Sequence, residues 1–363
     1  MRTLRRTPGL ANAEISRRTQ LAPQTVSLII NDLSQQGFIE ETEPLRGMRG
    51  QPARPRVLKS GGAFSFGCAI AWKYVDVVLT DLTGKVLNSY HRAYDYPDAD
   101  ILLNEIVEVI ASMRGDIPVE SLDRIEGLGV AMPTNIWLNI GRLNPPEHVT
   151  KTWRTFDVAK EFKALTGLDT KIINDGSAAS HAEQALGVGN DYPDFVYFFI
   201  SQFVCGGLVI ENKIFNGPSG NSGNLGGILV LNRSGKPEFV HLIASLFALK
   251  KEYLGAGEPV PEPDDFAGWR GQKIDLWIEA AGHAIALAIA NCGAVVESPV
   301  AIIDGRFPSA IRDRLTKATS EYLQTLPDTT FETPIVVAGK IGHMAEAIGA
   351  ADIPIHERHF SFD

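Results

Sequence analysis

The sequence predicts a mixed α/β protein in which a small winged helix-turn-helix head, residues 1–60, precedes a larger α/β body of two lobes. Three observations support this prediction. Near the N-terminus the apolar pattern changes from helix to turn to helix and then to two short strands, whereas later strands alternate with amphipathic helices in two series. The net charge changes sign between the two parts. At 363 residues, the chain is also too long for a single compact core.

The charge of the chain is unevenly divided. Residues 1–60 hold ten of the 34 basic residues and five of the 43 acidic ones, a net charge of +5. The rest of the chain therefore carries −14, although the whole-chain value of −9 alone would argue against a nucleic-acid binder. A basic head on an acidic body confines any attraction for phosphates to the head.

Two short helices joined by a tight turn form the centre of the predicted head. Asn12 is the expected N-cap of a helix that runs through residues 15–19. After a connection at residues 21–22, Pro23 occupies the first turn of a second helix, where its missing N–H costs nothing. Gly37 ends that helix as a left-handed cap. The apolar face of the second helix is formed by Val26, Ile29, Ile30 and Leu33.

Short polar side chains lie at the start of the second helix, away from its apolar face. In a recognition helix these positions contact base edges in the major groove. We therefore expect Gln24, Thr25, Ser27 and Leu28 to contact DNA, together with Arg17 and Arg18 of the preceding helix.

A basic loop between two predicted strands, residues 38–41 and 56–58, is typical of a wing. Its side chains suit phosphates or a narrow minor groove. The expected wing contacts are Arg46, Arg49, Gln51 and Arg54. A helical cap with a solvated basic loop is the alternative, but the order helix, turn, helix and wing within the positive segment favours DNA binding.

Only residues 1–7 precede Pro8, whereas the first helix of such a domain usually needs about ten residues. Either the protein starts further upstream or this first helix is unusually short.

Three scattered cysteines, none in a CxxC pair, cannot form a disulfide framework or a thiolate zinc site, and they favour a reducing compartment. No apolar segment follows the basic N-terminus, so no signal peptide is predicted. The most apolar stretch, residues 284–296, is interrupted by Asn291 and is too short and too polar to span a bilayer. We expect a buried core helix there and a cytoplasmic protein without a membrane partner.

The body is predicted to contain two series of elements around a cleft, where polar residues at strand ends are the default ligand candidates. The first series has strands at 64–70, 75–81, 85–91, 125–131 and 171–173 and helices at 101–113 and 177–186. The second has strands at 195–201, 207–210, 226–232, 300–304 and 335–338 and helices at 239–254, 274–297 and 308–324, with a hairpin turn at Asn212. The expected lobes are 61–178 with 350–363, and 179–349.

Five short sequence motifs occur along the chain in a characteristic order and spacing. They are Leu21–Ser27, Gly50–Pro52, Ile173–Ala179 with Ala182–Glu183, Gly206–Lys213 and Gly220–Gly227. In this order and spacing the chain resembles the ROK family (repressors, open reading frames and sugar kinases) over essentially its whole length. The resemblance implies an actin/hexokinase-like two-lobe domain behind the winged helix-turn-helix.

In kinases of this family two glycine-rich turns let the backbone approach the phosphates of ATP. The matching segments here are residues 67–73, with Ala69 at the position of an aspartate and Trp72 at that of a glycine, and residues 201–207, which contain Phe203. An indole at such a turn blocks the approach of a phosphate. We therefore expect no ATP binding, no catalytic residues and no cofactor.

The family commonly carries a structural zinc ion held by one histidine and three cysteines. Gly227 stands at the histidine position, and residues 231–240 contain no cysteine. We expect no zinc, because its tetrahedral site cannot be built without these ligands. The other histidines are dispersed in the sequence, and we expect His356 and His359 on the surface.

The sugar side of the cleft keeps one family motif. The pair Asn174-Asp175 matches the family's Asn-Asp pair, whose aspartate is the general base in kinases and accepts hydrogen bonds from sugar hydroxyls. A carboxylate at a strand end beside a helix N-terminus suits either role. The alternative is that Asp175 only caps the helix beginning at Ser177.

The other sugar ligands of the family are altered. His241 and Asn224 stand where glutamates are expected, and His148 is the nearest match to an asparagine that precedes Trp153. The predicted ligand set is Asn174, Asp175, Asn224, His241 and His148. These changes alter the hydrogen-bonding demand of the site, so its ligand is either a different sugar, an acidic or amidated one, or absent.

The resemblance implies a sequence-specific DNA-binding transcriptional regulator, expected to be a repressor of carbohydrate metabolism. A homodimer or homotetramer would bind an inverted-repeat operator, and a small carbohydrate effector would act through lobe closure. The sequence leaves open whether the effector releases or recruits DNA binding. An active carbohydrate kinase with a regulatory head and a ligand-independent DNA-binding scaffold are the alternatives.

Overall fold

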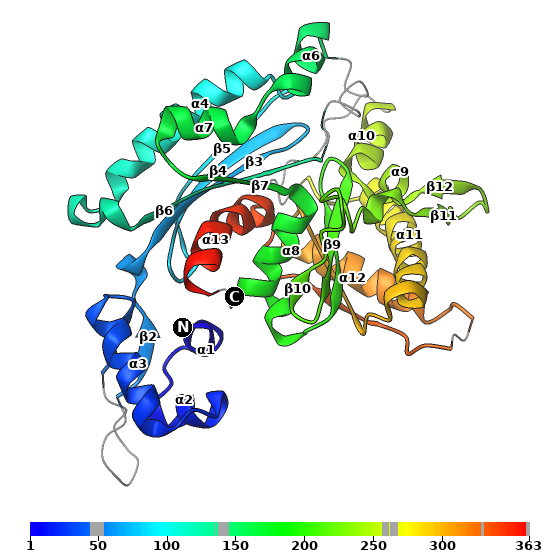
Figure 1. The fold of residues 1–363 in the computed structure, drawn as a ribbon. Helices are drawn as coiled ribbons and strands as arrows, with labels where there is room; N and C mark the ends of the chain where they lie inside the picture. The colour runs from blue at the N-terminus through cyan, green and yellow to red at the C-terminus, as the bar shows by residue number, and fades with distance from the viewer. Residues whose placement is uncertain are drawn as a thin grey trace.

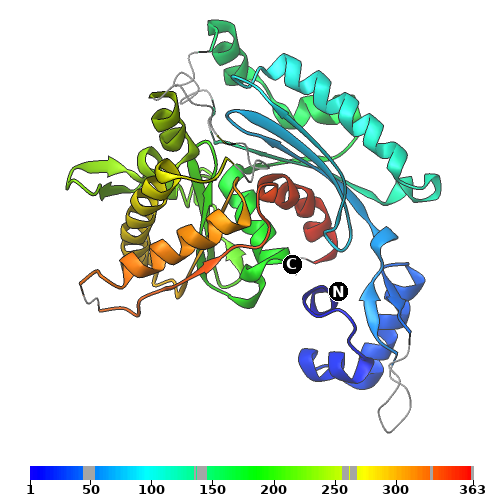
Figure 2. The ribbon, with the colours of Figure 1, turned by 180° about the vertical axis from the view of Figure 1, so that it is seen from behind.

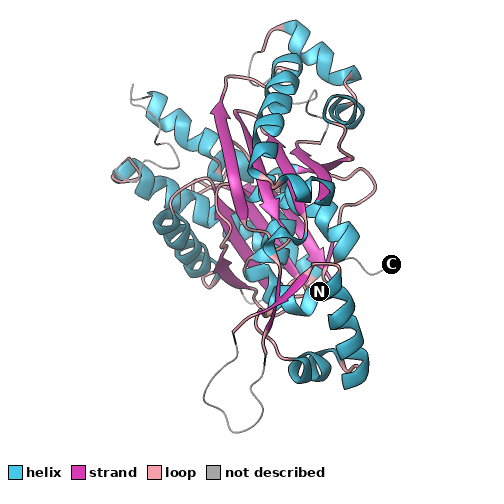
Figure 3. Cartoon of the chain, turned by 90° about the vertical axis from the view of Figure 1, so that its left-hand side faces the viewer, coloured by secondary structure: helices cyan, strands magenta, loops and turns pink. Residues whose placement is uncertain are grey.

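The computed structural model describes residues 1–43, 54–134, 136, 145–255, 261, 268–327 and 330–360. The head, the first sheet and the second sheet follow one another along the chain, and two helices, α8 and α13, lie between the sheets (Figure 1). Helices surround the strands when the molecule is viewed from the side (Figure 3). Short 3-10 segments connect several elements, at Ser60–Gly62, Arg114–Asp116, Val119–Arg124, Val188–Asp191 and Leu225–Gly227.

The head is a helix-turn-helix followed by an antiparallel strand pair in which Ile39 lies opposite Leu58. Its elements are α1 (Arg2–Arg6), α2 (Asn12–Thr19), α3 (Pro23–Gln35), β1 (Ile39–Glu41) and β2 (Arg56–Leu58). Helix α1 has five residues and begins directly after Met1. Pro23 begins α3, and Gly37 has a left-handed φ of 80°, as predicted.

Two details of the predicted head are wrong. The N-cap of α2 is Ala11, because Asn12 is already helical and Glu14 reaches back to the Ala11 backbone amide at 3.4 Å. Ile29 does not belong to the buried face of α3, since it is 42% exposed while Val26 and Ile30 are buried. The buried stripe is therefore narrower than the sequence pattern indicates.

The first sheet has the strand order β5-β4-β3-β6-β7, in which β3, β4 and β5 are antiparallel and β6 and β7 run parallel to β3. Three helices cover one face, and α13 covers the other (Figure 1). The elements are β3 (Phe64–Ile70), β4 (Tyr74–Asp81), β5 (Val86–Ala93), α4 (Ala99–Met113), β6 (Ile125–Met132), α6 (Glu147–Thr155), α7 (Val158–Thr166) and β7 (Thr170–Asn174).

The second sheet has the order β10-β9-β8-β13-β14, with β13 parallel to both β8 and β14. A separate two-stranded ribbon, β11–β12, projects beside it (Figure 1). The strands are β8 (Phe195–Ile200), β9 (Val204–Ile210), β10 (Lys213–Ile214), β11 (Leu229–Leu231), β12 (Pro237–Phe239), β13 (Val300–Gly305) and β14 (Ile335–Ala338). The helices are α8 (Asp175–Leu186), α9 (Val240–Ala244), α10 (Leu246–Gly255), α11 (Gln272–Val296) and α12 (Ser309–Leu323).

The predicted helix at 239–254 is divided into α9 and α10 by a break at Ser245. The predicted strand at 226–232 is shorter than expected, since only β11 (Leu229–Leu231) is a strand. The hairpin turn at Asn212 is confirmed, since Glu211 and Asn212 both have positive φ. Helix α11 confirms the predicted helix at 274–297. It has 25 residues and a mean hydropathy of 1.4 over its most apolar window, so the apolar segment is longer than the stretch 284–296 identified in the sequence. By length and composition alone α11 is able to cross a membrane, but its buried residues pack against the second sheet and α12.

Helix α13 (Ala345–His359), at the centre of the molecule, was not predicted from the sequence. It contains Pro354 and a run of small residues buried on nearly all sides, so it lacks the amphipathic period that identifies a helix. Two strand glycines allow its close approach: a Cβ on Gly67 would lie 2.0 Å from the Ala347 carbonyl oxygen, and one on Gly129 would lie 1.9 Å from that of Ala350. The backbone of α13 therefore rests directly on β3 and β6.

The head shares a hydrophobic core with the body. Leu4, Ile15 and Ile30 of the head belong to the same buried cluster as Ile355 and Phe360, which lie in and just after α13. Viewed from behind, the head lies beside the end of α13 (Figure 2). This packing fixes the head against the body.

Polar contacts reinforce the junction. Arg124 donates hydrogen bonds to the carbonyl oxygens of Gln36 in the head, at 3.2 Å, and of Gly62 in the connecting segment, at 3.1 Å. The Asp81 carboxylate accepts from the Ser60 hydroxyl at 2.5 Å and from the Thr83 amide at 2.8 Å. The connection between head and body is therefore hydrogen-bonded rather than a loose linker.

Candidate DNA-binding head and ligand cavity

The predicted DNA-contacting side chains of α3 lie at its exposed N-terminal end. Gln24 and Thr25 are exposed, and Leu28 is 71% exposed although it is apolar. Ser27 is half-buried and donates its hydroxyl to the Pro23 carbonyl oxygen at 3.0 Å. A large apolar side chain exposed on a recognition helix suits contact with a thymine methyl group.

The structure describes three of the predicted basic DNA contacts, Arg17, Arg18 and Arg54. Arg17 and Arg18 are exposed on α2, and Arg18 donates to the Thr7 hydroxyl at 3.2 Å. Arg54 is exposed and forms an ion pair with Glu41 at 3.0 Å. Arg46, Arg49 and Gln51 lie outside the described residues.

A cavity of about 410 Å³ opens where strands β3, β6, β7 and β8 end. Four of the five predicted ligand residues line it: Asn174, Asp175, Asn224 and His241. The other lining residues are Trp72, Pro133, Thr134, Ser201, Phe203, Val204, Cys205, Asn221, Gly227 and Phe239. His148 is not among them, because it lies 68% exposed on α6 with its Nε2 3.4 Å from the Asp98 carboxylate.

Asn174 lines the cavity and forms hydrogen bonds with two neighbouring residues. Its side-chain oxygen accepts from the Ser177 amide at 3.1 Å, and its side-chain nitrogen donates to the Thr134 hydroxyl at 3.1 Å. Asn174 is thus the N-cap of α8, and Asp175 is the first helical residue. The alternative in which Asp175 serves only as the cap is therefore wrong, which leaves its carboxylate available to a ligand.

Two acidic side chains lie together beneath the cavity, at the N-terminal ends of α8 and α13. Burial raises the pKa of Asp175 to about 6, although the Gly176 amide donates to its carboxylate at 2.8 Å. Burial and the proximity of Asp175 raise the pKa of Glu346 to about 8, although the Tyr74 hydroxyl donates to it. Near neutral pH the pair therefore retains one proton, held mainly by Glu346.

Cys205 lies beside this acidic pair, with one donor atom from each of the three residues within 4.8 Å of the others. Burial raises the pKa of the Cys205 thiol well above its ordinary value. A thiol that stays protonated is a weak metal ligand. A metal ion at this trio would have to displace the thiol proton.

Aromatic rings form the wall of the cavity. Trp72 and Phe203 meet nearly edge to face with ring centroids 5.7 Å apart, and Phe203 meets His241 in the same way at 5.9 Å. Phe239 stacks on His241 at 5.7 Å, and His241 Nδ1 donates to the Gly226 carbonyl oxygen at 2.7 Å. Flat rings beside amide and carboxylate groups suit a ligand that has both apolar C–H faces and hydroxyl groups.

The turn that corresponds to the second phosphate loop is closed by bonds within the protein. The Ser201 amide donates to the Phe203 carbonyl oxygen at 2.9 Å. The carbonyl oxygens of Ser201 and Gln202 accept from the Leu246 and Phe247 amides at 3.0 and 3.1 Å. The first amides of α10 are therefore already bonded to protein oxygens, which leaves them poorly placed to bind phosphate.

A buried polar network joins the two sheets behind the cavity. Arg306, which follows β13, donates to Asp76 of β4 at 2.5 Å and lies over the Tyr74 ring at 3.7 Å. Asp76 also contacts His91 Nδ1 at 2.6 Å. Through Tyr74 the network reaches Glu346. The signal for it in the sequence was an aspartate within an otherwise apolar strand.

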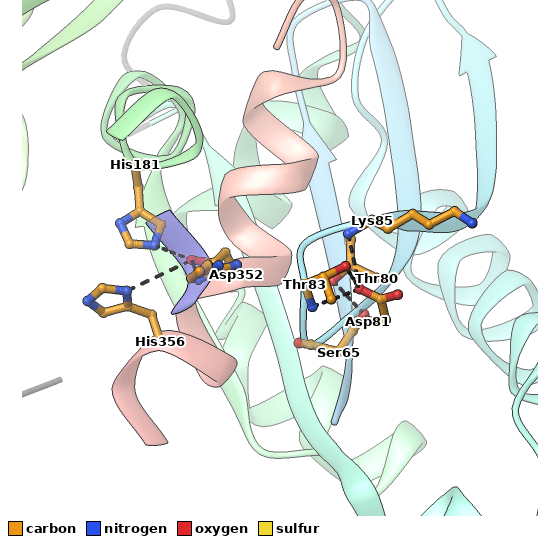
Figure 4. Close-up of polar contacts among 9 residues, drawn as sticks. Ser65, Thr80, Asp81, Thr83, Lys85, His181, Asp352 and His356 are labelled. Carbon is orange, nitrogen blue, oxygen red and sulfur yellow. Dashed lines mark hydrogen bonds and ion pairs between the residues drawn. The ribbon is translucent and has the colours of Figure 1, made fainter. Parts of the chain in front are cut away.

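A second polar cluster lies between α8 and α13 (Figure 4). His181 and His356 both point toward Asp352, with nitrogen-to-oxygen distances of 2.9 and 3.9 Å. His356 is 31% exposed, and His359 is 9% exposed with a 2.6 Å contact to Glu126. The expected surface position of His359 is therefore wrong, whereas His356 is half-buried at the edge of this cluster.

Comparison with known protein families matches residues 67–357 to the ROK family and residues 1–40 to a winged helix-turn-helix DNA-binding domain. The chain belongs to the ROK family. A relative of known name is the xylose repressor of Bacillus subtilis, 23% identical over 60% of this chain and 56% of the repressor. The DNA-binding transcriptional dual regulator NagC of Escherichia coli is 24% identical over 61% of this chain and 54% of the regulator. The chain thus spans about half the length of these relatives.

Solved structures of ROK proteins share the fold. One, described as a ROK family transcriptional regulator homologous to an E. coli MLC protein, has a TM-score of 0.66 and 20% identity, with 96% of this chain and 91% of that chain covered. A ROK family glucokinase from Streptomyces griseus, in complex with glucose and AMPPNP, has a TM-score of 0.62 and 18% identity over 80% of this chain and 99% of that chain. The ROK fold therefore occurs in both regulators and kinases, and the fold alone does not separate the two.

Proposed function

We propose that this ROK protein is a sugar-responsive DNA-binding repressor without kinase activity. The observation that carries the proposal is the combination in one chain of an exposed recognition helix with a cavity built around Asp175 whose neighbouring turns are filled by Trp72 and Phe203. The winged helix-turn-helix match and the relatives named as regulators support the same function.

The cavity favours an uncharged, unphosphorylated sugar. Its described lining contains amides, hydroxyls and aromatic rings but no lysine or arginine. Among the described lining residues, a phosphate or carboxylate on the ligand would face Asp175 without a lysine or arginine to compensate its charge, which is costly in a buried site. Of the ligand classes considered from the sequence, the acidic one is therefore disfavoured.

The ligand would act by changing how the two lobes close. We place these lobes at residues 61–178 with 350–363, and at 179–349. The protein would bind an inverted-repeat operator as a homodimer or homotetramer in the cytoplasm. A ligand changes DNA affinity only if it binds one spacing of the two heads more tightly than the other.

DNA binding is tested with a fragment selected from a random-sequence library by the wild-type protein. Gln24→Ala and Thr25→Ala should each weaken binding to this fragment about tenfold, because each removes a base-edge contact. Gln35→Ala, a change at the exposed far end of the same helix, is the matched control and should have no effect. Unchanged affinity in both test variants, measured by fluorescence anisotropy at two salt concentrations, would refute the assignment of the head.

Sugar binding is tested by thermal shift with D-xylose, D-glucose, N-acetyl-D-glucosamine and their phosphates. A neutral sugar should raise the Tm, because a ligand that binds only the folded state stabilises it. Asp175→Asn should abolish this shift, whereas Glu147→Gln, a change at a residue 82% exposed on α6, should not. Stabilisation by sugar phosphates alone would contradict the proposed ligand class.

A kinase is the second candidate function, favoured by one observation. Asp175 has a pKa of about 6 and lies in the cavity, which suits a general base that accepts a proton from a sugar hydroxyl. Formation of sugar phosphate from MgATP, abolished by Asp175→Asn, would establish this function in place of the sensor. No turnover, together with a sugar-dependent Tm shift, would establish the sensor.

A further inference from the structure

Helices α8 and α13 each reach from the ligand cavity to the DNA-binding head. Asp175 and Glu346, near their N-terminal ends, lie together beneath the cavity. His181 and Asp352 follow six residues later on α8 and α13, which corresponds to about 9 Å along each helix. A Cβ on Gly349 would lie 1.8 Å from the α8 backbone, so the two helices touch directly. A shift of either helix at the cavity therefore moves the cluster around Asp352.

Arg5 of α1 joins the head to this cluster. Its guanidinium forms a two-pronged ion pair with the Asp352 carboxylate, and the two side chains are only 7% and 2% exposed. His181 Nε2 contacts the same carboxylate at 2.9 Å. Burial would raise the pKa of Asp352, but Arg5 and His181 outweigh burial and hold it well below its ordinary value. Asp352 is thus a fully ionised carboxylate whose main partner comes from the head.

Further contacts hold α1 in the same place. Arg5 lies over the Phe360 ring, 4.4 Å from its centroid, and Arg2 donates to the Phe360 carbonyl oxygen at 2.7 Å. Leu4 is buried in the core that the head shares with α13. Because α1 also packs against α2 and β2, and α2 packs against α3, a displacement of α1 is transmitted to the recognition helix.

The ion pair is costly to break, because both side chains are buried. Withdrawal of Arg5 leaves the Asp352 carboxylate buried with His181 as its remaining close partner, and a buried charge that loses its main counter-charge strongly disfavours that state. The head is therefore expected to occupy discrete positions, with Arg5 either in place or released, rather than to drift.

We propose that Arg5 and Asp352 form a latch, with Asp352 as the positioning residue, through which a ligand in the cavity controls the orientation of the DNA-binding head. The latch rests on the proposed function and says how a signal would pass from the sugar cavity to the DNA-binding head. Ligand contacts at Asp175 move the paired helices α8 and α13, and the displaced Asp352 and His181 change the equilibrium between the latched and released positions of α1.

The same cluster also has the composition of a metal site, since donor atoms of His181, Asp352 and His356 lie within 4.8 Å of one another. Both Asp352 oxygens, however, already accept hydrogen bonds from Arg5. Arg5 is therefore the cation around which the cluster is built, and a divalent ion would have to displace it. Binding of a divalent ion by these residues would overturn the latch.

The test compares Arg5→Gln and Asp352→Asn with Arg6→Gln in the full-length protein. Arg6 lies on the same helix, carries the same charge and is exposed, with one 3.2 Å hydrogen bond to Asn212. The first measurement is amide hydrogen exchange of α1 in protein without DNA or sugar. Exchange in α1 should be at least about tenfold faster in Arg5→Gln and Asp352→Asn than in the wild type, and unchanged in Arg6→Gln. Equal exchange in all four proteins would overturn the latch.

The second measurement is affinity for the library-selected DNA fragment with and without D-xylose or D-glucose. The ratio of the two affinities should fall toward one in Arg5→Gln and Asp352→Asn while the sugar-induced Tm shift is retained, and Arg6→Gln should keep the wild-type ratio. A wild-type ratio of one would refute the proposed sugar response and leave hydrogen exchange to decide on the latch. Wild-type ratios in all variants would overturn the latch alone.

Two further variants keep the test decisive. If Asp352→Asn fails to fold, Arg5→Lys replaces it, because lysine retains the charge but cannot make the two-pronged contact, so α1 exchange should increase to a smaller extent. Addition of Co²⁺ should give no tetrahedral absorption band. A band that disappears in His181→Ala would overturn the latch in favour of a metal site.

Discussion

Gly349 of α13 lies against the backbone of Ala178 in α8, so close that a Cβ on Gly349 would stand 1.8 Å from the Ala178 carbonyl oxygen. A Gly349→Ala substitution must therefore force the two helices apart. We expect it to lower the free energy of unfolding by about 1–3 kcal/mol, as measured by urea denaturation. Gly115→Ala, where a Cβ would meet nothing within 4 Å, should change it by less than about 0.5 kcal/mol. Equal effects of the two changes would contradict the close contact.

Sugar binding should depend on pH through Asp175. The ionised carboxylate accepts hydroxyl hydrogen bonds, and with a pKa of about 6 it is about one tenth ionised at pH 5 and nine tenths ionised at pH 7. Affinity should therefore increase about tenfold from pH 5 to pH 7, as measured by isothermal titration calorimetry. In Asp175→Asn this dependence should disappear along with most of the affinity. Tighter binding at pH 5 would show that the protonated acid is the binding form.

The N-cap of α8 offers a test that separates stability from binding. Asn174→Ala removes the acceptor for the Ser177 amide and should lower the free energy of unfolding by about 1 kcal/mol. Asn174→Ser keeps a capping oxygen and should restore most of this stability, yet it loses the amide donor that contacts Thr134. Both variants should bind sugar more weakly than the wild type. If Asn174→Ser binds sugar as the wild type does, the Asn174 amide has no part in the cavity.

Trp72 should report ligand binding by its fluorescence. Its indole is 8% exposed and lines the cavity, so a bound sugar will change its surroundings. A neutral sugar should quench part of the tryptophan emission in the wild type, and Trp72→Phe should lose this response while it keeps the Tm shift.

MgATP at millimolar concentration should neither quench the emission nor raise the Tm. A saturable response to MgATP in the micromolar range would contradict the expectation that the turns containing Trp72 and Phe203 cannot bind the phosphates of ATP.

Acid should weaken the junction between head and body. Burial and His181 lower the pKa of His356 to about 4, so between its ordinary value near 6.5 and pH 4 the unfolded chain binds more protons than the folded one. Stability is therefore lost as pH falls through this window. Because His356 is 31% exposed, we expect its protonation to lower the free energy of unfolding by at most about 1.5 kcal/mol. His356→Asn should remove that share of the slope, measured by urea denaturation from pH 7 to pH 4, and an unchanged slope would contradict it.

Local signals predicted much of the fold. Pro23 and Gly37 mark the ends of α3 because their backbone preferences act at single positions, and the buried strands β3 and β8 follow from continuous apolar runs. The break at Ser245 was missed because apolar residues continue through it. Helix α13 was missed because it is buried on nearly all sides, which removes the period on which sequence analysis depends.

The candidate cavity was predicted where a motif is continuous in sequence, and missed where it is assembled in space. Asn174 and Asp175 are adjacent and lie in the cavity as expected. His148 was chosen by its distance from Trp153 in the sequence, but α6 turns it toward Asp98. Glu346 and Asp352 carry no local signal, since their partners Asp175 and His181 are 171 residues away in each case. Such pairs become visible only once α8 and α13 are packed together.

The hydrophobic interior of the head is completed by Ile355 and Phe360, which lie near the other end of the chain. The head is therefore unsuited to exchange as an interchangeable module, either by recombination between relatives or in an engineered chimera. A graft that carries residues 1–60 onto another body would expose the apolar side chains that Ile355 and Phe360 cover. In this chain, substitutions at the exposed positions of α3 would change DNA contacts without disturbing that shared core.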